Sequence, residues 1–574
     1  MVLKNKRNRF QQAQYSMKKL FYAVAALIAA SLIAHAETRS PKGDIKANLA
    51  IFNAVVKEVQ SNYVDSIDME DVVETAIAAM LNKFDPYTEY MPRKVQEDFK
   101  VLNSGEYGGI GSYIMQRDGN VYISGPHKGS PADKAGLRSG DLIMSVDTVT
   151  VLGMTSDKVS ERLKGPRGTT VKVKVKRPYV GADSILTFDI VREKIQIPAV
   201  SYSGMLPGEI GYIQLSQFSE KSAEEVEDAL KSMLATGKLK GLVLDLRDNG
   251  GGFLESAVKI LGYFLPKGTE VLRTRGKGVM DERVYKTAGK PIAPDLPLVV
   301  LIDDGTASAS EITSGALQDL DRAVIMGSRS FGKGLVQTTR SIPYDGLLKV
   351  TVARYYIPSG RLIQAIDYSH RNPDGTVARI PDSLTNVFTT AAGREVRDGG
   401  GITPDVKVTY PDITRVTYNA VRDNWVFDYA NRYRATHDHI APAAEFVVDD
   451  SIYADFKRFI DPAKFNHDNV GKAILDRLSE VATVEGYMSD SLKNQIAVVE
   501  GMLQRPLDQD LDANRKAIVP YLEREIANRY YYREGEAQSF LRHDVAIDSA
   551  LSLLKDSDRY KALLAPKSRK STKK

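Results

Sequence analysis

The sequence predicts a multi-domain α+β protein with a helical N-terminal region, a small β-rich domain, an α/β core and a helical C-terminal region. The chain has 574 residues, which at roughly 150 residues per domain suggests three or four domains. The spacing of hydrophobic residues is helical at first, then alternating, then mixed, and finally helical again. The chain contains no cysteine, which excludes disulfides, thiolate zinc sites, iron-sulfur clusters and a cysteine nucleophile.

The charge balance gives little support to a nucleic-acid partner. The formal net charge is +5, but six positive charges lie before residue 37, where there is no acidic residue. Without that segment a net charge of −1 remains, too little positive charge to favour the phosphates of a nucleic acid. We therefore expect no nucleic-acid partner. Residues 565–574 are interpreted as a solvated basic tail.

Residues 1–36 are interpreted as a secretory signal peptide. Two lysines precede an apolar run of 15 residues, which ends in Ala-His-Ala, the small-x-small form of a signal-peptidase site. Because Met17 begins a complete signal by itself, the true start is either Met1 or Met17. The run is shorter than the roughly 20 residues that span a bilayer, which favours cleavage near Glu37 over a retained anchor. We expect export to the periplasm, with membrane association only if the signal is retained.

The next two segments differ in the spacing of their apolar residues. Residues 37–106 are a predicted helical region, since apolar residues recur at spacings of three and four from Ile45 onward. The run FDPYTEY at 84–90 interrupts this pattern, because Pro86 ends a helix. Residues 107–193 read as short alternating runs with frequent glycine, which predict strands.

The β-rich segment resembles a PDZ domain. Its sequence GSPADKAGL at 129–137, followed by GD and LIMSVD, combines a helix start, a helix stop and a strand at set offsets. In PDZ domains the backbone N–H groups of a glycine-rich loop bind the carboxylate of a peptide, whose chain adds to the edge of the sheet. Here that loop would be Gly109, Ile110 and Gly111. The alternative is an ordinary glycine-rich hairpin.

Strands and helices alternate from residue 194 to residue 410, which predicts an α/β core. Strands are expected at 210–215, 241–246, 298–302, 323–326 and 348–355, and helices at 223–239, 254–264 and 310–320. Residues 411–564 return to the helical period, with helices expected at 470–481 and 490–503, and form a C-terminal region without an assigned role. Its YYYREG run at 530–535 is interpreted as core or interface packing.

The first segment that could carry catalytic residues is GTASASE at 305–311. It follows an apolar strand and opens a helix, so a hydroxyl there would point out of the sheet beside the free N–H groups of the helix start. This placement suits a nucleophile. A serine at a helix start is more often only a cap, and the segment is not the Gly-x-Ser-x-Gly elbow of α/β-hydrolases.

The second segment is FGKG at 331–334. Lys333 lies between two glycines, so neighbouring backbone can enclose it, and burial lowers the pKa of a lysine. Such a lysine can act as a general base. The segment from Gly327 onward also begins like a phosphate-binding P-loop, but Gly334 occupies the place of the Ser or Thr that would hold magnesium.

A third segment, DLRDNGGG at 245–252, runs from a strand into three glycines. Backbone can approach a substrate closely there, although an ordinary sharp turn is the alternative. No histidine lies in any of these segments, so the sequence does not indicate a Ser/His/Asp triad. His437 and His439 form the one close pair of histidines and are interpreted as surface residues rather than metal ligands.

Seven segments occur in the order seen in carboxy-terminal processing peptidases, also called tail-specific proteases, and residues 45–410 resemble this family. They are FDPYTEY, the PDZ segment, DLRDNGGG, GTASASEI, FGKGLVQ, YYIPSGRLIQ at 355–364 and GGGITPD at 399–405. The resemblance implies a protease core of the crotonase-like type with a Ser/Lys dyad. Ser308 matches the nucleophile, Lys333 the general base and Gln337 the residue that orients the lysine. The backbone N–H groups of Ala309 and Gly251 match the oxyanion hole.

The resulting prediction is an exported serine endopeptidase that recognises protein C-termini through its PDZ domain and cleaves through an acyl-serine intermediate, without a metal or cofactor. Its expected partners are polypeptides with accessible C-termini. The alternatives are a catalytically silent PDZ scaffold, disfavoured by the joint presence of Ser308, Lys333 and Gln337, and a P-loop nucleotide enzyme, disfavoured by Gly334. The sequence leaves open the natural substrate, whether the chain forms a homo-oligomer and whether an adaptor protein activates it.

Overall fold

A computed structural model describes residues 45–566 apart from 94, 95, 97–100, 102, 103, 180–183, 279–281, 373, 374, 468, 469 and 504. The chain divides into two compact units, Met1–Lys83 and Phe84–Lys574. The predicted signal peptide at 1–36 lies outside the described residues, as does most of the basic tail. None of the described helices is both long enough and apolar enough to cross a membrane.

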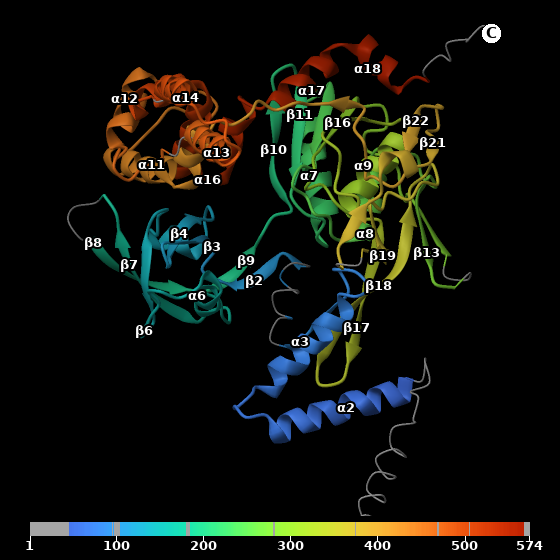
Figure 1. Ribbon diagram of the computed structural model, residues 1–574. Helices are drawn as coiled ribbons and strands as arrows, with labels where there is room; N and C mark the ends of the chain where they lie inside the picture. Colours follow the sequence, from blue (N-terminus) through green and yellow to red (C-terminus); the bar gives the residue numbers. More distant parts are fainter. Residues whose placement is uncertain are drawn as a thin grey trace, which may run out of the picture. The chain divides into compact units, whose positions relative to one another are not determined.

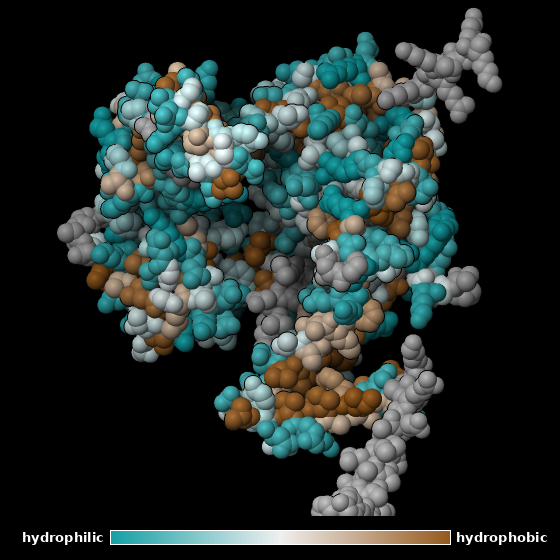
Figure 2. Space-filling view, in the orientation of Figure 1, coloured by the Kyte–Doolittle hydropathy of each residue, from teal (hydrophilic) through white to brown (hydrophobic). Residues whose placement is uncertain are grey.

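The first unit contains the two predicted N-terminal helices, α2 (Ile45–Asn62) and α3 (Met69–Leu81). Asp68 caps α3, because its side chain accepts hydrogen bonds from the backbone N–H groups of Glu70 and Asp71. Apolar side chains gather on the exposed surface of α2 (Figure 2), among them Ile45, Leu49, Phe52 and Val55.

The second unit begins with the predicted PDZ domain. Its sheet has the order β3-β4-β5-β7-β8, with β6 paired to β5. The strands and helices are β2 (Glu106–Gly109), β3 (Ser112–Arg117), β4 (Asn120–Pro126), α5 (Pro131–Ala135), β5 (Leu142–Val146), β6 (Val149–Thr150), α6 (Ser156–Leu163), β7 (Thr170–Arg177), β8 (Ser184–Val191) and β9 (Glu193–Gln196). Valines of β7 face the core while its lysines face solvent. Strands β2 and β9 pair with each other where the domain begins and ends.

The α/β core is built on a six-stranded sheet of order β10-β11-β12-β15-β16-β23. These strands are β10 (Val200–Leu206), β11 (Ile210–Leu215), β12 (Gly241–Asp245), β15 (Leu298–Ile302), β16 (Val324–Gly327) and β23 (Val406–Lys407). Strand β10 is antiparallel to β11, and the other pairs are parallel. The five strands expected at 210–215, 241–246, 298–302, 323–326 and 348–355 are all present, with ends that differ by at most two residues.

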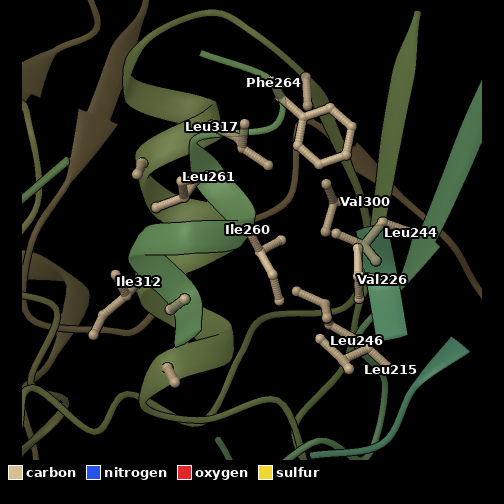
Figure 3. Packing of buried hydrophobic residues seen from close by; sticks show 14 of the residues in the cluster. Leu215, Val226, Leu244, Leu246, Ile260, Leu261, Phe264, Val300, Ile312 and Leu317 are labelled. Atoms are coloured by element: carbon tan, nitrogen blue, oxygen red, sulfur yellow. The ribbon is translucent and has the colours of Figure 1, made fainter. Parts of the chain in front are cut away.

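Three helices cover one face of this sheet (Figure 1), and Figure 3 shows buried side chains packed between helices and strands. They are α7 (Ser222–Leu234), α8 (Leu254–Leu261) and α9 (Ala309–Asp319). Ile260 of α8 and Ile312 of α9 join Leu244 and Val300 of the sheet in one buried cluster. Helix α7 ends five residues before the predicted boundary, at Leu234.

The other face of the sheet is covered by the end of the chain, α17 (Val545–Lys555) and α18 (Ser557–Leu564). Tyr560 fastens this layer, since its hydroxyl donates to the carbonyl of Leu298 and accepts from the N–H of the same residue. Residues 545–564 therefore pack on the core sheet, a contact that the predicted C-terminal helical region 411–564 did not include. An amphipathic period shows that a helix buries one face but not which surface covers it.

A second sheet forms the other part of the core. It contains β1 (Glu89–Met91), β13 (Glu270–Gly276), β14 (Glu282–Lys286), β17 (Leu335–Ile342) and β18 (Gly346–Tyr356). Strand β1 lies within the predicted helical region 37–106 but pairs with β18, with Tyr90 opposite Leu348. A strand of three residues has too little hydrophobic pattern to be predicted, so the sequence did not indicate β1 within this region. Short hairpins follow at β19 (Ile366–Arg371) with β20 (Val377–Arg379) and β21 (Val387–Thr389) with β22 (Glu395–Arg397).

The predicted C-terminal helical region has its own buried core, which includes Tyr429, Phe456 and Leu522. Its helices are α10 (Arg415–Arg422), α11 (Trp425–Thr436), α12 (Asp450–Phe459), α13 (Val470–Val484), α14 (Asp490–Leu503), α15 (Leu507–Ala513) and α16 (Arg515–Leu541). Helix α16 is interrupted at Tyr532, whose φ of 57° and ψ of −156° are not helical.

Candidate active site

Ser308 occupies the turn between β15 and α9. It has φ 55° and ψ −114°, a backbone conformation that residues other than glycine rarely adopt. Its backbone N–H donates to Glu311 Oε2 at 2.9 Å, and its side chain is partly exposed. A strained turn at the carboxyl end of a strand presents the hydroxyl at the rim of the sheet, as a nucleophile requires.

The neighbouring hydroxyls of the same motif have structural partners. Ser310 is fully buried, and its Oγ donates to the carbonyl of Asn249 at 2.8 Å. Thr306 Oγ1 is likewise buried and donates to the carbonyl of Leu246. Ser308 is therefore the hydroxyl of the motif that a substrate could reach.

Lys333 lies in the loop between β16 and β17, half-buried between its two glycines. A Cβ at Gly332 would collide with Ala365, and one at Gly334 would lie 2.9 Å from the backbone nitrogen of Gln364. Burial, with a smaller contribution from the charge of Lys349, lowers the pKa of Lys333 to about 8. The enclosure that the sequence predicted for this lysine is present.

Glu311 joins the two loops. Its carboxylate is fully buried and accepts from the backbone N–H groups of both Ser308 and Lys333, each at 2.9 Å to Oε2. Its Oε1 accepts from the N–H of Gly332 at 2.7 Å and from Ser330 Oγ at 2.5 Å. Burial raises the pKa of Glu311 above its usual value, and these four hydrogen bonds, which favour the ionised form, oppose this rise without reversing it.

Tyr355 of β18 makes a second connection between the loops. Its hydroxyl lies 2.6 Å from the carbonyl oxygen of Lys333 and 3.2 Å from that of Ser308. Sequence reasoning assigned no role to Glu311 or Tyr355, although both lie in segments that were quoted for the family resemblance. Their contacts depend on tertiary structure, which residue spacing does not reveal.

The amide of Gln337 has another partner than the lysine. Its Nε2 donates to Thr351 Oγ1 of β18 at 3.1 Å, and among the described residues no hydrogen bond joins it to Lys333. Its predicted role in orienting Lys333 stays a prediction.

The two residues predicted to form the oxyanion hole, Gly251 and Ala309, lie close together. Gly251 has φ 100° and packs so closely on the serine turn that an added Cβ would lie 2.8 Å from the nitrogen of Ala309 and from Ser308 Cβ. The N–H of Ala309 belongs to the first residue of α9, where no earlier turn of the helix can accept it. The N–H of Gly251, however, donates to Asn249 Oδ1 at 2.9 Å. One of the two predicted donors is therefore engaged within its own turn.

The predicted peptide-binding loop of the PDZ domain is anchored through its carbonyl groups. The carbonyl of Ile110 accepts from the N–H of Ala132, and the carbonyl of Gly111 accepts from Ser130 Oγ and the N–H of His127. Gly111 has φ 73°, and an added Cβ would lie 2.6 Å from Ser130 Cβ. Ser130 and Ala132 belong to the start of α5, so this helix fixes the shape of the loop.

His437 and His439 are both exposed. The ring of His437 stacks on Tyr433 with the centroids 4.0 Å apart. Within the part of the chain that the structure describes, no group of three His, Cys, Asp or Glu residues is placed to hold a metal ion.

Four family models match successive parts of the chain. The model of peptidase family S41 matches residues 209–377, and a PDZ-domain model matches residues 122–177. The model of the C-terminal helical domain of a probable PDZ-protease matches residues 416–554. The model of the N-terminal domain of the activating protease CtpB matches residues 11–95.

Individual relatives agree with these matches. A carboxy-terminal-processing protease of Bartonella bacilliformis is 36% identical over 386 residues, which are 66% of this chain and 87% of the relative. The carboxy-terminal processing protease CtpA of Bacillus subtilis is 35% identical over 54% of this chain and 66% of its own length. Among solved structures, the photosystem II D1 C-terminal processing protease is 28% identical over 62% of this chain and 86% of that chain, with a TM-score of 0.33. The chain belongs to peptidase family S41 and is a carboxy-terminal processing serine protease with a PDZ domain.

Proposed function

We propose that the protein is an exported endopeptidase in which Ser308 is the nucleophile and Lys333 the general base. The observation that carries this assignment is the carboxylate of Glu311, which accepts hydrogen bonds from the backbone of both residues and so places the two loops in one site. The lowered pKa of Lys333, about 8, leaves a useful fraction of neutral amine near neutral pH.

The reaction follows from these roles. Ser308 Oγ attacks the carbonyl carbon of the substrate while Lys333 Nζ takes the hydroxyl proton. The N–H groups of Ala309 and Gly251 stabilise the negative oxygen of the tetrahedral intermediate. When the C–N bond breaks, Lys333 returns the proton to the leaving amine. Water, deprotonated by Lys333, then hydrolyses the acyl-serine ester and regenerates the hydroxyl.

Two local changes separate the described structure from this reactive arrangement. Lys333 Nζ must approach Ser308 Oγ, since no hydrogen bond joins these atoms among the described residues, and the N–H of Gly251 must leave Asn249 Oδ1. The first change lies in the loop that Glu311 joins to the serine turn, and the second lies in the glycine turn after β12. We infer that substrate binding favours them.

The test compares two serines. Ser308→Ala should abolish cleavage of an unfolded test protein, because no other accessible hydroxyl lies in the motif. Ser310→Ala should retain most activity, because the carbonyl of Asn249 still accepts from the N–H of Ala307. Reaction with a serine-directed probe, read by mass spectrometry, checks both variants. Equal activity of the two variants, or labelling of Ser308→Ala, would reject Ser308 as the nucleophile.

We also propose that the PDZ domain binds substrate C-termini at Gly109, Ile110 and Gly111. A free carboxylate can accept from the N–H groups of this loop, whereas an amide lacks the charge that strengthens such hydrogen bonds. In the full-length Ser308→Ala variant, a peptide with a free apolar C-terminus should therefore bind at least about tenfold more tightly than its amide. Coinciding titration curves for the two peptides would reject this site.

Export is proposed from the sequence of residues 17–36, which supports a cleaved signal. The expected mature chain begins near Glu37 and is recovered from the periplasm. The N-terminal sequence of the purified native protein and its cell fraction test this. A mature chain that keeps residues 17–36 would show that the segment is retained.

A further inference from the structure

The amine of Lys333 lies against an aromatic ring from a distant part of the chain. Lys333 Nζ is 4.3 Å from the centroid of the Tyr87 ring, within the range of a cation–π interaction. Among the described residues, no ion pair or hydrogen bond links this amine to a carboxylate or to Ser308. The ring is therefore the nearest defined partner of the ammonium group.

The ring of Tyr87 is fixed from both ends. Asp85 Oδ1 accepts from the backbone N–H groups of Tyr87 and Thr88, at 2.8 and 2.7 Å, which sets the turn that carries the ring. Thr88 Oγ1 in turn accepts from the N–H of Thr351, so β18 holds the same turn. At the other end, the Tyr87 hydroxyl lies 3.3 Å from that of Tyr368, and the two rings meet edge to face.

We infer that Tyr87 is a positioning residue for Lys333: its ring holds the protonated amine away from Ser308 and releases the neutral amine. The negative face of an aromatic ring attracts an ammonium ion but has no comparable attraction for a neutral amine. Loss of the proton thus frees Lys333 to turn toward the serine in the form that can act as a base. This inference rests on the proposed function of Lys333 and adds a residue that makes its position depend on its charge.

The groups around Lys333 determine whether a weaker interaction with Tyr87 raises or lowers the pKa of the lysine. The charged groups that act on its pKa are Lys349 of β18, Asp85 and Glu89 on either side of Tyr87, and Glu311 of α9. Lys349 is itself paired with Glu89 at 2.8 Å. Burial and the hydrogen bond to Tyr368 raise the pKa of Tyr87, so its phenol stays neutral through the titration of the lysine. A cation–π interaction stabilises the charged lysine, so weakening it lowers the pKa of Lys333.

The test changes the electronics of the ring without changing its shape. Position 87 is occupied in turn by tyrosine, phenylalanine, 4-fluorophenylalanine, 3,5-difluorophenylalanine and pentafluorophenylalanine, in the full-length Ser308→Ala variant. The pKa of Lys333 is followed by NMR of isotope-labelled lysine, with the signal assigned by its loss in Lys333→Arg. Phenylalanine should leave the pKa nearly unchanged, and fluorination should lower it progressively, by about 0.4 to 1.5 pH units in all. Tyr368→Phe is the matched control, since it removes the hydroxyl contact but not the ring, and it should cause no shift.

The same substitutions at position 87, made in the enzyme with Ser308 restored, distinguish failure of this inference from failure of the proposed function. The acid limb of kcat/KM should move to lower pH in step with the pKa of Lys333, because the neutral base then persists at lower pH. A pKa that does not respond to fluorination overturns the role of Tyr87 and leaves Ser308 and Lys333 as assigned. A pKa that falls while the acid limb stays in place overturns Lys333 as the base, and the positioning role with it.

Discussion

At the scale of single residues, the site depends on buried groups that would not touch the substrate. Glu311 is fully buried, and each of its carboxylate oxygens accepts two hydrogen bonds from the loops that carry Ser308 and Lys333. A carboxylate can accept at all these positions, whereas an amide replaces one acceptor by a donor. The two acceptor oxygens of Glu311 are therefore needed for the geometry of the site.

We expect Glu311→Gln to lower kcat by about 10- to 100-fold with little change in KM, because misalignment of reacting groups slows the chemical step. The variant should also lose on the order of 1.5 to 3 kcal/mol of stability, since one or more buried N–H groups lose a charged acceptor. Steady-state kinetics and chemical unfolding measure the two effects. Glu255→Gln is the matched control, because Glu255 is exposed in the first turn of the neighbouring helix α8. An unchanged kcat in Glu311→Gln would contradict this role.

At the scale of an element, the three glycines of the DLRDNGGG turn are not equivalent. A Cβ at Gly250 would meet no atom within 4 Å. Gly251 has φ 100° and faces the nitrogen of Ala309, and Gly252 has φ 141° and would collide with the carbonyl of Phe218. The sequence indicated a close approach of backbone to substrate, and the structure shows that two of the three positions require glycine.

We therefore expect Gly251→Ala to reduce kcat/KM by at least about 100-fold, because the new methyl group would occupy the space beside the N–H of Ala309. It should also lose about 1 to 3 kcal/mol of stability, the usual cost of a positive φ and of close contact. Gly250→Ala, one residue away, should keep both activity and stability. Activity assays beside thermal unfolding of the two variants make the comparison. Similar losses in both would show that the turn tolerates no side chain at all and that Gly251 has no special role.

At the scale of the second unit, the PDZ domain is tied to the C-terminal helical region where α16 is interrupted. The Tyr532 hydroxyl donates to Asp133 Oδ1 at 2.7 Å, and the guanidinium of Arg533 lies 3.8 Å from the centroid of the Tyr113 ring. Lys128 pairs with Glu534 at 3.3 Å. These contacts account for the YYYREG run, which was interpreted as core or interface packing. They reach α5, the helix that shapes the peptide-binding loop.

We expect Tyr532→Phe to loosen α5, because the loss of one hydrogen bond to a carboxylate is worth about 1 kcal/mol at a partly exposed site. Backbone hydrogen exchange of residues 132–135 should then be roughly fivefold faster. Tyr531→Phe provides the control, since the Tyr531 hydroxyl donates to the carbonyl of Ile440 within the helical region. If both variants exchange alike in α5, the Tyr532 contact does not hold the helix.

Much of the second unit could be predicted from the sequence because its signals are local. Alternating valines and lysines identified β7, apolar runs identified β12 and β15, and Ser130 with Gly136 marked the two ends of α5. The family resemblance directed attention to Ser308 and Lys333, which the structure places on two loops joined by Glu311. The role of Gln337 and the crotonase-like type of the core stay predictions.

The sequence by itself determined the order of the domains, the family and the segments in which chemistry is expected, because hydrophobic period, turn residues and motifs act over a few neighbouring residues. Only the tertiary structure decided that Tyr87 lies on Lys333, that the N–H of Gly251 is engaged by Asn249, and that α17 and α18 cover the second face of the sheet. The contact of Tyr87 and the packing of α17 and α18 join segments far apart in the chain, so no local spacing encodes them. The hydrogen bond of Gly251 is local, but it depends on a backbone conformation that the close packing of the serine turn imposes.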